Sequence, residues 1–270
     1  MAKRKRENNE RQNEKKKKDK RGHGHFDQYK PWLNIQDLGS TGLATRIKGI
    51  KTGRLHHFLS TLELDYFYLL DWSEEVIDIR EQYPLDLPET LALAKECNVT
   101  HPPLSNPTKP IVMTTDFLIT IRQPIGTKEI ARTIKYSTDL TSARVLEKFE
   151  LERLYWQERK IDWGIVTELD INKVIVKNIK WFYKYLETGS LPAPLTPSQI
   201  PKLTDYMLAI IKKGEISLRN ISKACDDKHD LPVGSSLALV RHLLATRKWQ
   251  VNLLKPIQPE KPLNFEKVVN

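Results

Sequence analysis

Apolar and polar positions alternate along the chain in patterns that predict an ordered series of helices and strands. Segments 75–85, 113–121 and 131–137 are rich in β-branched and aromatic residues at short spacing, which is typical of strands. Segment 59–72 instead predicts an amphipathic helix. Its apolar side chains recur on one helical face: Leu59, Leu62, Tyr66, Leu69 and Leu70.

The remaining periodic segments complete a mixed α/β pattern. A long charged helix is predicted over 141–160, a strand over 162–168 and a lysine-rich helix over 171–186. The order from residue 59 onward is helix, three strands, helix, strand, helix. We therefore predict an α/β domain built on a mixed sheet with a hairpin-like centre and helices on its faces.

A proline-rich segment separates this part from a smaller C-terminal part. Residues 187–201 read ETGSLPAPLTPSQIP and predict an interdomain linker. Three helices and an extended segment follow, which is the order of a winged helix-turn-helix. A generic three-helix module that binds protein is the alternative. The predicted domains are a disordered tail (1–22), an α/β domain (23–187), the linker (188–201) and a winged-helix-like domain (202–270).

Positive charge is concentrated at the N-terminus. The chain carries a formal charge of +10, and residues 1–21 contribute +7 of it from eleven Lys/Arg and four Asp/Glu. Such a segment has no apolar face to bury and is predicted to be disordered. It is either a solvated tail or import-like basic run, or an arm that binds phosphates. For the second reading, the predicted DNA contacts are Lys3, Arg4, Lys5, Arg6, Lys15, Lys16, Lys17 and Lys18, with Lys51 and Arg54 in a KTGR loop.

Several classes of protein are disfavoured by composition. The two cysteines, Cys97 and Cys225, form neither a disulfide framework nor a CxxC metal motif. No apolar segment follows the basic N-terminus, and no run of about 18 apolar residues is present, so we expect neither a signal peptide nor a membrane span. These features fit a protein of the reducing cytosol.

Three charged residues lie where the predicted elements should converge. Asp116 and Lys135 lie on two strands that are expected to be neighbours, and Glu63 lies on the preceding helix. Phosphodiester hydrolysis needs a divalent cation that neutralises the phosphate and activates water. Mg²⁺ prefers a few carboxylate oxygens, and an adjacent lysine can orient water or hold the phosphate.

Each of these residues also has a purely structural interpretation. Ser60 and Glu63 have the spacing of a capping box, so Glu63 can serve only to cap its helix. Asp116 can cap the start of a strand. Lys135 can pair with Asp116 or extend to solvent from an edge strand. Spacing alone leaves both interpretations open for all three residues.

Several separated blocks, in the same order, resemble one family of nucleases. The chain is similar to the TnsA family, the restriction-endonuclease-like endonuclease subunit of heteromeric TnsA–TnsB transposases. The resemblance covers most of the chain. It lies in these blocks: YKPWL (29–33), KTGRLHHFLSTLEL (51–64), DIREQYPL (78–85), TTDFL (114–118), IKYS (134–137) and LEKFELERLYW (146–156).

The resemblance implies roles for the three charged residues. Glu63 and Asp116 would be metal ligands, Lys135 the active-site lysine, and the cofactor Mg²⁺ or Mn²⁺. By the same resemblance, the protein would hydrolyse the 5′ strands at transposon ends in double-stranded DNA. A TnsB-like DDE recombinase would cut the 3′ ends, and the C-terminal domain would dock a TnsC-like ATPase regulator.

One position departs from the restriction-like pattern. Where that pattern has Glu, Asp or Gln two residues before the lysine, this chain has Thr133. The backbone carbonyl of Ile134 is a candidate to complete the metal site. Glu152 lies on one helical stripe with Phe149 and Trp156 and is a candidate to support the site from behind, or a solvated helix charge. Thr133 also keeps open a catalytically decayed subunit that only binds DNA and assembles partners, and a stand-alone resolvase or repair nuclease is a third possibility.

Overall fold

The computed structural model describes residues 10–37, 45–102, 110–188 and 194–269. The chain forms two compact units, Met1–Ile171 (unit 1) and Asn172–Asn270 (unit 2). The boundary thus lies before helix α5 (Lys173–Thr188) and not at the proline-rich segment predicted as the linker. The physical reason is that α5 packs its apolar face against helix α8 of unit 2.

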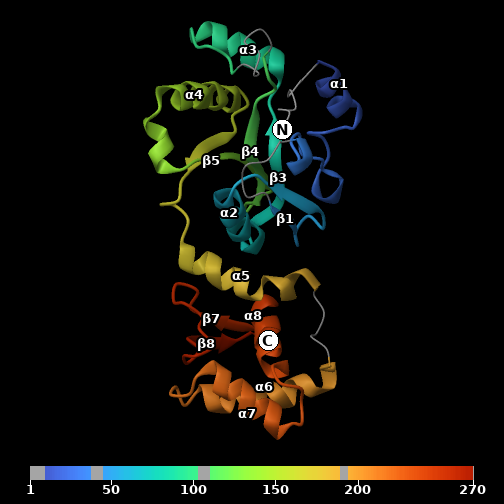
Figure 1. The fold of residues 1–270 in the computed structure, drawn as a ribbon, viewed down its shortest axis with the longest axis vertical. Coiled ribbons are helices and arrows are strands. Elements are labelled where there is room, and N and C mark those ends of the chain that lie inside the picture. The colour runs from blue at the N-terminus through green and yellow to red at the C-terminus, as the bar shows by residue number, and fades with distance from the viewer. Residues whose placement is uncertain (1–9, 38–44, 103–109, 189–193, 270) are drawn as a thin grey trace, which may run out of the picture. The chain divides into compact units, whose positions relative to one another are not determined.

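A four-stranded mixed sheet forms the centre of unit 1 (Figure 1). Its strands lie in the order β3 (Val76–Pro84), β4 (Thr114–Arg122), β5 (Thr127–Ile134) and β6 (Asp162–Val166). The first two strand pairs are antiparallel, and β5 and β6 are parallel. The predicted mixed α/β sheet is confirmed. However, β5 begins before the predicted segment 131–137 and ends at Ile134, so Lys135 lies just beyond the strand.

Helices α3 (Leu87–Glu96) and α4 (Ala143–Glu158) cover one face of the sheet. Leu118 of β4 and Ala131 of β5 are buried there against Trp156 and its neighbours on α4. The periodicity of segment 141–160 predicted this buried stripe, because residues three and four apart share one face of a helix.

The opposite face carries helix α2 (Thr61–Trp72) and the hairpin of β1 (Thr45–Lys48) and β2 (Leu55–Phe58). Phe58, Phe67 and Phe117 are fully buried where hairpin, helix and sheet meet. The ring centroids of Phe58 and Phe67 are 4.7 Å apart, and those of Phe58 and Phe117 are 6.0 Å apart. This aromatic cluster fixes the start of α2 relative to β4.

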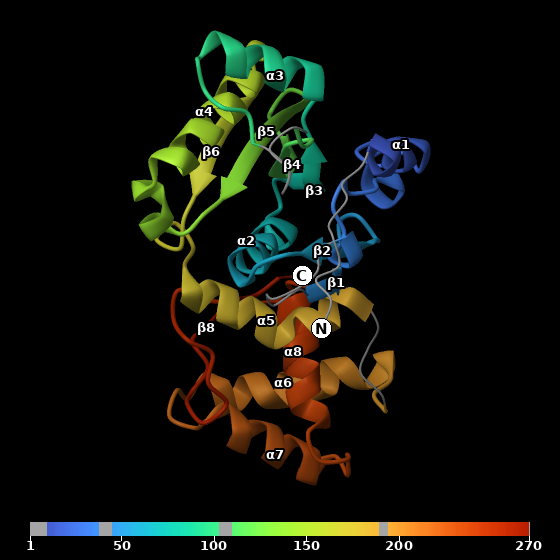
Figure 2. The same ribbon diagram turned by 45° about the horizontal axis from the view of Figure 1, so that its top comes forward.

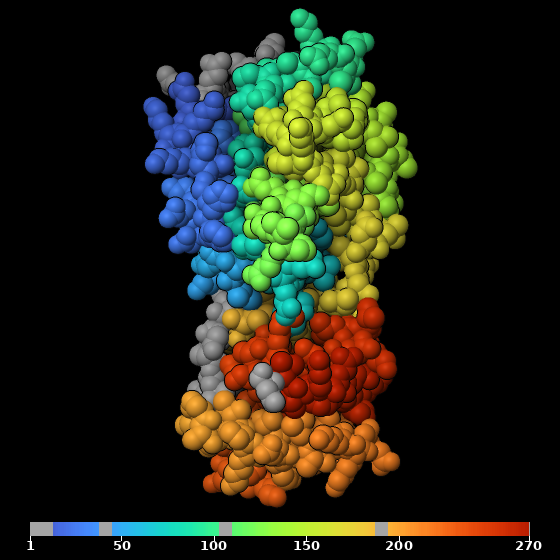
Figure 3. Space-filling view, turned by 180° about the vertical axis from the view of Figure 1, so that it is seen from behind, coloured from blue at the N-terminus to red at the C-terminus, as the bar shows by residue number. Residues whose placement is uncertain are grey.

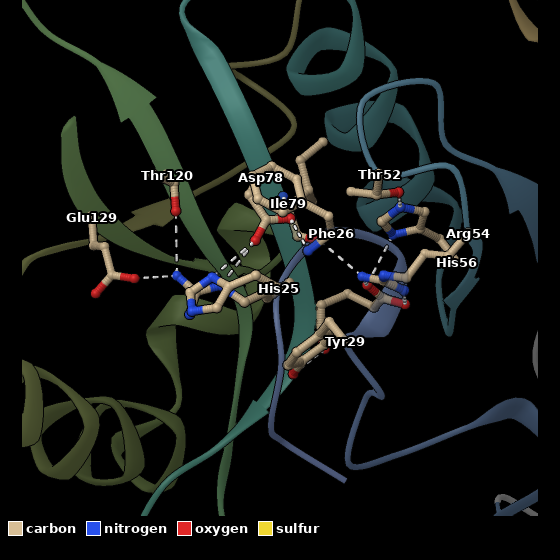
Figure 4. Close-up of polar contacts among 12 residues, drawn as sticks. His25, Phe26, Tyr29, Thr52, Arg54, His56, Asp78, Ile79, Thr120 and Glu129 are labelled. Atoms are coloured by element: carbon tan, nitrogen blue, oxygen red, sulfur yellow. Dashed lines mark hydrogen bonds and ion pairs between the residues drawn. The ribbon is translucent and has the colours of Figure 1, made fainter. Parts of the chain in front are cut away.

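A buried ion pair joins the hairpin to β3 (Figure 4). Arg54 donates to Glu81 from both terminal nitrogens and also to the Ile79 carbonyl at 2.8 Å. Nδ1 of His56 lies 2.8 Å from the Glu81 carboxylate, and its Nε2 lies 2.7 Å from the Thr52 hydroxyl. Burial alone would raise the pKa of Glu81, but His56 and Arg54 hold that pKa well below its usual range.

This pairing changes the interpretation of Arg54. The sequence predicted that Arg54 contacts DNA phosphates, but its side chain is only 9% exposed. Its charge is compensated by Glu81, and the ring of Tyr29 lies 5.0 Å from its guanidinium. Arg54 is therefore a structural residue of the interior. Its burial is possible because Glu81 on β3 compensates its charge.

The basic N-terminal segment is partly ordered, contrary to the prediction that residues 1–22 are disordered. Residues Glu10–Lys18 form helix α1, which lies with the following segment against the body of unit 1 (Figure 3, blue). Lys16 is 6% exposed, with its ammonium 5.3 Å from the centre of the Trp32 ring. Arg21 pairs with Asp37 and donates to the Trp32 carbonyl. The segment orders because Trp32 supplies an apolar partner and Asp37 an acidic one from the part of the chain that follows.

These placements separate the basic residues predicted to contact DNA. Lys15, Lys17 and Lys18 are exposed. Lys16 is enclosed, and burial lowers its pKa. The backbone N–H of Lys51 donates to Asp71, and its side chain is half-buried. The residues Lys3, Arg4, Lys5 and Arg6 lie outside the described part of the chain.

Unit 2 contains the predicted three helices and an added strand pair (Figure 2). After α5 come α6 (Ile200–Ile211), α7 (Leu218–Lys228), α8 (Ser235–Ala245), β7 (Trp249–Val251) and β8 (Phe265–Val268). The two strands pair antiparallel. The order of elements is the one predicted, while membership of the winged-helix class stays a prediction. Among the described helices, none is long and apolar enough to cross a membrane.

A polar cluster is buried between the sheet and α4. Glu152 accepts hydrogen bonds from the hydroxyls of Thr115, at 2.7 Å, and Thr133. Trp156 donates to Thr115 at 2.7 Å, and Trp163 donates to Thr133 at 3.2 Å. Burial raises the pKa of Glu152 from its ordinary 4.5 to about 7, although the two hydroxyls oppose this shift. The alternative in which Glu152 is a solvated helix charge is wrong, because the residue is 1% exposed.

The buried Glu152 predicts a pH-dependent stability. Because its pKa is higher in the folded state than in the unfolded state, stability falls as pH rises from about 4.5 to about 7. Glu152→Gln removes the ionisation and keeps an acceptor for the two threonines. In chelator, we expect wild type to lose about 2–3 kcal/mol relative to this variant between pH 4.5 and pH 8 in urea unfolding. Parallel pH profiles for the two proteins would contradict the prediction. Glu152→Ala is the comparison that leaves the hydroxyls without an acceptor, so it should destabilise at every pH.

Candidate active site

A cavity of about 500 Å³ opens between α2, the sheet and α4 of unit 1. Glu63, Asp116, Thr133, Ile134 and Lys135 all line it, so the residues that the sequence placed on separate elements do converge. They converge because β4 and β5 are neighbours in the sheet and the aromatic cluster holds the start of α2 beside β4.

Both carboxylate oxygens of Asp116 are held by donors. The backbone N–H of Ile134 donates to Oδ2 at 2.7 Å, and Nε2 of Gln82 donates to Oδ1 at 3.1 Å. Gln82 is buried and accepts in turn from the Thr114 hydroxyl at 3.1 Å. The side chain of Asp116 is therefore fixed by β3 and β5 together, which is more than the capping of one strand requires.

Glu63 caps its helix and also lines the cavity that contains Asp116. Its carboxylate accepts from the Leu59 N–H at 3.1 Å and the Ser60 hydroxyl at 2.8 Å, while Ser60 accepts from the Glu63 N–H. These bonds cap the start of α2, although Leu59 supplies the backbone donor where a standard capping box would use Ser60. The same carboxylate also faces the cavity that contains Asp116.

Ionising either acid is costly in this cavity. Burial, followed by the negative charge of Asp116, raises the pKa of Glu63 to about 8. Burial also raises the pKa of Asp116, against the opposing effects of the Ile134 N–H and of Lys148. A cation between two such groups would favour both ionised forms and reverse these shifts.

The donor set fits a hard divalent cation. Among the described residues, no group of three or more His, Cys, Asp or Glu side chains could hold a metal ion. The acidic ligands in this cavity would therefore be two, Glu63 and Asp116. Mg²⁺ is commonly held by one or two carboxylates with water and phosphate in its other positions. The backbone N–H of Ile134 donates to Asp116, whereas the N–H of Lys135 donates to Val166 on β6. Successive residues of a strand direct their backbone groups to opposite sides, so the Ile134 carbonyl is directed to the same side as Asp116.

Lys135 lines the cavity without pairing with Asp116. Its Nζ lies 2.9 Å from the carboxylate of Asp139, in the turn that follows the strand, and its side chain is 36% exposed. Exposed ion pairs are weak, on the order of 0–1 kcal/mol. The ammonium can therefore exchange Asp139 for a phosphate in the cavity at little cost.

Thr133 and Glu152 form a second layer on the α4 side of the site. The Thr133 hydroxyl donates to Glu152, so it is occupied by that carboxylate. A carboxylate is thus present beside this strand position, but it comes from Glu152 on helix α4. This arrangement explains why a threonine fits at that strand position.

Two further residues were missed by the sequence analysis. Lys148 on α4 lines the cavity and exerts a larger favourable charge effect on Asp116 than Lys135 does. Gln82 orients Asp116 from β3. The sequence offered a signal only for Lys148, which lies four residues before the predicted supporting residue Glu152 and so on the same helical stripe.

Comparison with known proteins gives one consistent answer. Residues 73–168 match a family model described as TnsA-like endonuclease N terminal, and residues 170–253 match one described as TnsA endonuclease C terminal. The chain is also 37% identical over 253 residues to the Escherichia coli protein called Transposon Tn7 transposition protein TnsA, covering 93% of this chain and 89% of that protein.

The boundary between the two family models falls at the boundary between the two units of the structure. The N-terminal model contains Asp116, Lys135 and Glu152, and the aligned 253 residues extend well beyond it. The structural convergence of the predicted residues and these matches lead to the same conclusion. The chain belongs to the TnsA family of transposition endonucleases.

Proposed function

We propose that this protein is a metal-dependent DNA endonuclease that hydrolyses the 5′ strands at transposon ends within a cut-and-paste transposase complex. One observation carries the proposal: two buried carboxylates from different elements face one cavity, beside two lysines that can bind phosphate. Capping of α2 accounts for Glu63 alone, and burying two acids in one cavity is unfavourable without a cation.

Glu63 and Asp116 would hold Mg²⁺, or Mn²⁺, with the Ile134 carbonyl as a third ligand. The metal would lower the pKa of an attacking water and neutralise charge on the phosphate. The Ile134 N–H and Gln82 keep the Asp116 carboxylate in a single orientation. Positioning of this kind removes the need to reorganise the site during the reaction.

Lys135 would bind the scissile phosphate or orient the water after leaving Asp139. Lys148 approaches the same cavity from α4 and would hold a second phosphate oxygen or the adjacent phosphate. Both are ammonium groups, which act as compact point charges toward phosphate. The metal and the two lysines together would oppose the charge that develops in the transition state.

The family resemblance also supports partners. Duplex DNA at transposon ends would be the substrate, with exposed Lys15, Lys17 and Lys18 of α1 contacting its backbone. A TnsB-like DDE recombinase would cut the other strand, and unit 2 would dock a TnsC-like ATPase. The competing function is a decayed assembly subunit, for which the specific observation is the neutral Thr133 at the strand position of a carboxylate.

Asp116→Asn and Lys135→Ala should each abolish cutting of the 5′ strand. Asn keeps an acceptor for the Ile134 N–H but removes the charge that a metal needs, and Ala removes the ammonium. We expect losses of more than about 100-fold for both. The measurement is strand-specific cleavage of transposon-end DNA with Mg²⁺ and the recombinase and ATPase partners, resolved on a denaturing gel.

Lys128→Ala is the matched control for this experiment. Lys128 is an exposed lysine at the other end of strand β5, so its loss should leave cleavage unchanged. Intact 5′ strands with wild-type protein, while the 3′ ends are still cut, would instead identify this chain as an assembly subunit. Robust cutting without partners would indicate a stand-alone nuclease.

Lys148→Gln should reduce 5′-strand cleavage by about 10- to 100-fold while leaving the fold intact. The substitution removes the cation with the larger effect on Asp116 but keeps most of the side-chain length. Single-turnover cleavage rates, compared with Lys128→Gln, measure the effect. Equal rates for the two variants would show that Lys148 lines the cavity without contributing to cleavage.

A further inference from the structure

Helix α5 of unit 2 presents a straight row of four lysines to solvent. Lys173, Lys177, Lys180 and Lys184 are all exposed, and over residues 173–186 they are the exposed residues of the helix. Their spacing of four, three and four residues places them on one face of an α-helix. At about 1.5 Å of rise per residue, the row is roughly 16 Å long.

The composition of this helix distinguishes the row from an ordinary solvated face. Between Lys173 and Lys184 the helix contains no Asp or Glu, and its one acid, Glu187, follows in the last turn. Like charges three and four residues apart cost on the order of 0.2–0.5 kcal/mol of helix stability for each pair. On α4 the exposed charges are arranged differently, as the pairs Arg144–Glu147 and Glu150–Arg153. The row on α5 therefore places like charges next to one another where α4 alternates them.

The side of α5 opposite the lysines is packed against the rest of unit 2, and this packing sets the direction in which the lysines project. Val176, Ile179 and Phe182 are buried on the side of the helix that packs with α8. Asn178 donates to the carbonyls of Leu253 and Lys255 at 2.9 Å and accepts from the N–H of Ile257. The lysines thus project from a helix whose rotation is set by packing.

This packing also limits access to the usual DNA-reading surface of a winged helix. In that class the third helix enters the major groove. Here the third helix of the motif, α8, has no exposed residue between Ser235 and Ala245. In Figures 1 and 2, α5 crosses α8, and the two helices are in contact. Only half-buried residues of α8, such as Arg241, remain accessible, so α5 is the more exposed of the two helices.

We propose that the lysine row of α5 is a binding surface for the phosphate backbone of duplex DNA, independent of base sequence. A row of ammonium groups on a rigid helix matches a line of phosphates, and release of counterions supplies the free energy. Protein interfaces instead use aromatic and apolar anchors at their centre and are depleted of lysine. The exposed face of α5 over 173–186 contains lysine alone.

The test compares two variants of the full-length chain with equal net charge. One carries Lys173→Gln, Lys177→Gln, Lys180→Gln and Lys184→Gln. The control carries the same change at four other exposed lysines of unit 2, Lys202, Lys212, Lys213 and Lys223. Binding to a fluorescent duplex of arbitrary sequence is measured by anisotropy over a series of KCl concentrations, with EDTA present so that no cleavage occurs.

The row variant should lower the slope of log K against log [KCl] by about 0.9 for each phosphate that the row neutralises, or roughly 2–4 in all. The control should change the slope by less than about 1 on the same counterion-release relation. Thermal unfolding should be the same for both, and the double change Lys177→Gln with Lys180→Gln should give about half the effect.

Equal slopes for the row variant and the control would overturn the proposal, since net charge alone would then explain the binding. An unchanged slope, together with failure to retain the ATPase partner, would also overturn it by assigning the row to a protein. The assay does not depend on catalysis, and we expect the same result in an Asp116→Asn background. Failure of the nuclease proposal and failure of this one are therefore distinguishable.

Discussion

The burial of two acids, Glu63 and Asp116, in one cavity is the constraint on which the candidate site of unit 1 depends. Burial and the neighbouring charge raise the pKa of Glu63 to about 8, so the site resists ionisation unless something compensates it. Backbone donors at the ends of two elements supply part of that compensation: the N–H of Ile134 at the end of β5 and the N–H of Leu59 before α2. The points at which β5 ends and α2 begins are therefore part of the site itself. A bound cation would supply the remainder.

Strand β3 connects this site to the rest of the unit through two adjacent residues. Glu81 ties the strand to the β1–β2 hairpin through Arg54 and His56, and Gln82 directs its amide to Asp116. Gln82 has a positive φ of 49°, an uncommon backbone conformation for a residue other than glycine. Local strain of this kind persists when the surroundings determine it, here through the buried ion pair on one side and Asp116 on the other.

The sequence predicted those features that depend on local periodicity, and it failed where distant partners decide the outcome. Helix α2 and strand β4 were placed within about two residues, and the predicted convergence of Glu63 and Asp116 is seen in the cavity that both line. Arg54 looked like a phosphate contact because Glu81, 27 residues away, is invisible to local pattern. Helix α1 was missed for the same reason, since its order depends on Trp32 and Asp37. Lys148 could be assigned only once α4 was seen to border the cavity.

Unit 2 shows why the order of elements is a weak guide to function. Three helices followed by a strand pair predict a winged helix, and the class suggests a reading helix in the major groove. The preceding helix α5 makes this surface less accessible, because its apolar face packs against α8 and covers part of it. A boundary placed at the prolines would have left α5 in unit 1 and α8 uncovered. The assignment of one helix to one unit thus changes which surface can meet DNA, and that assignment comes from packing energy, not from the motif.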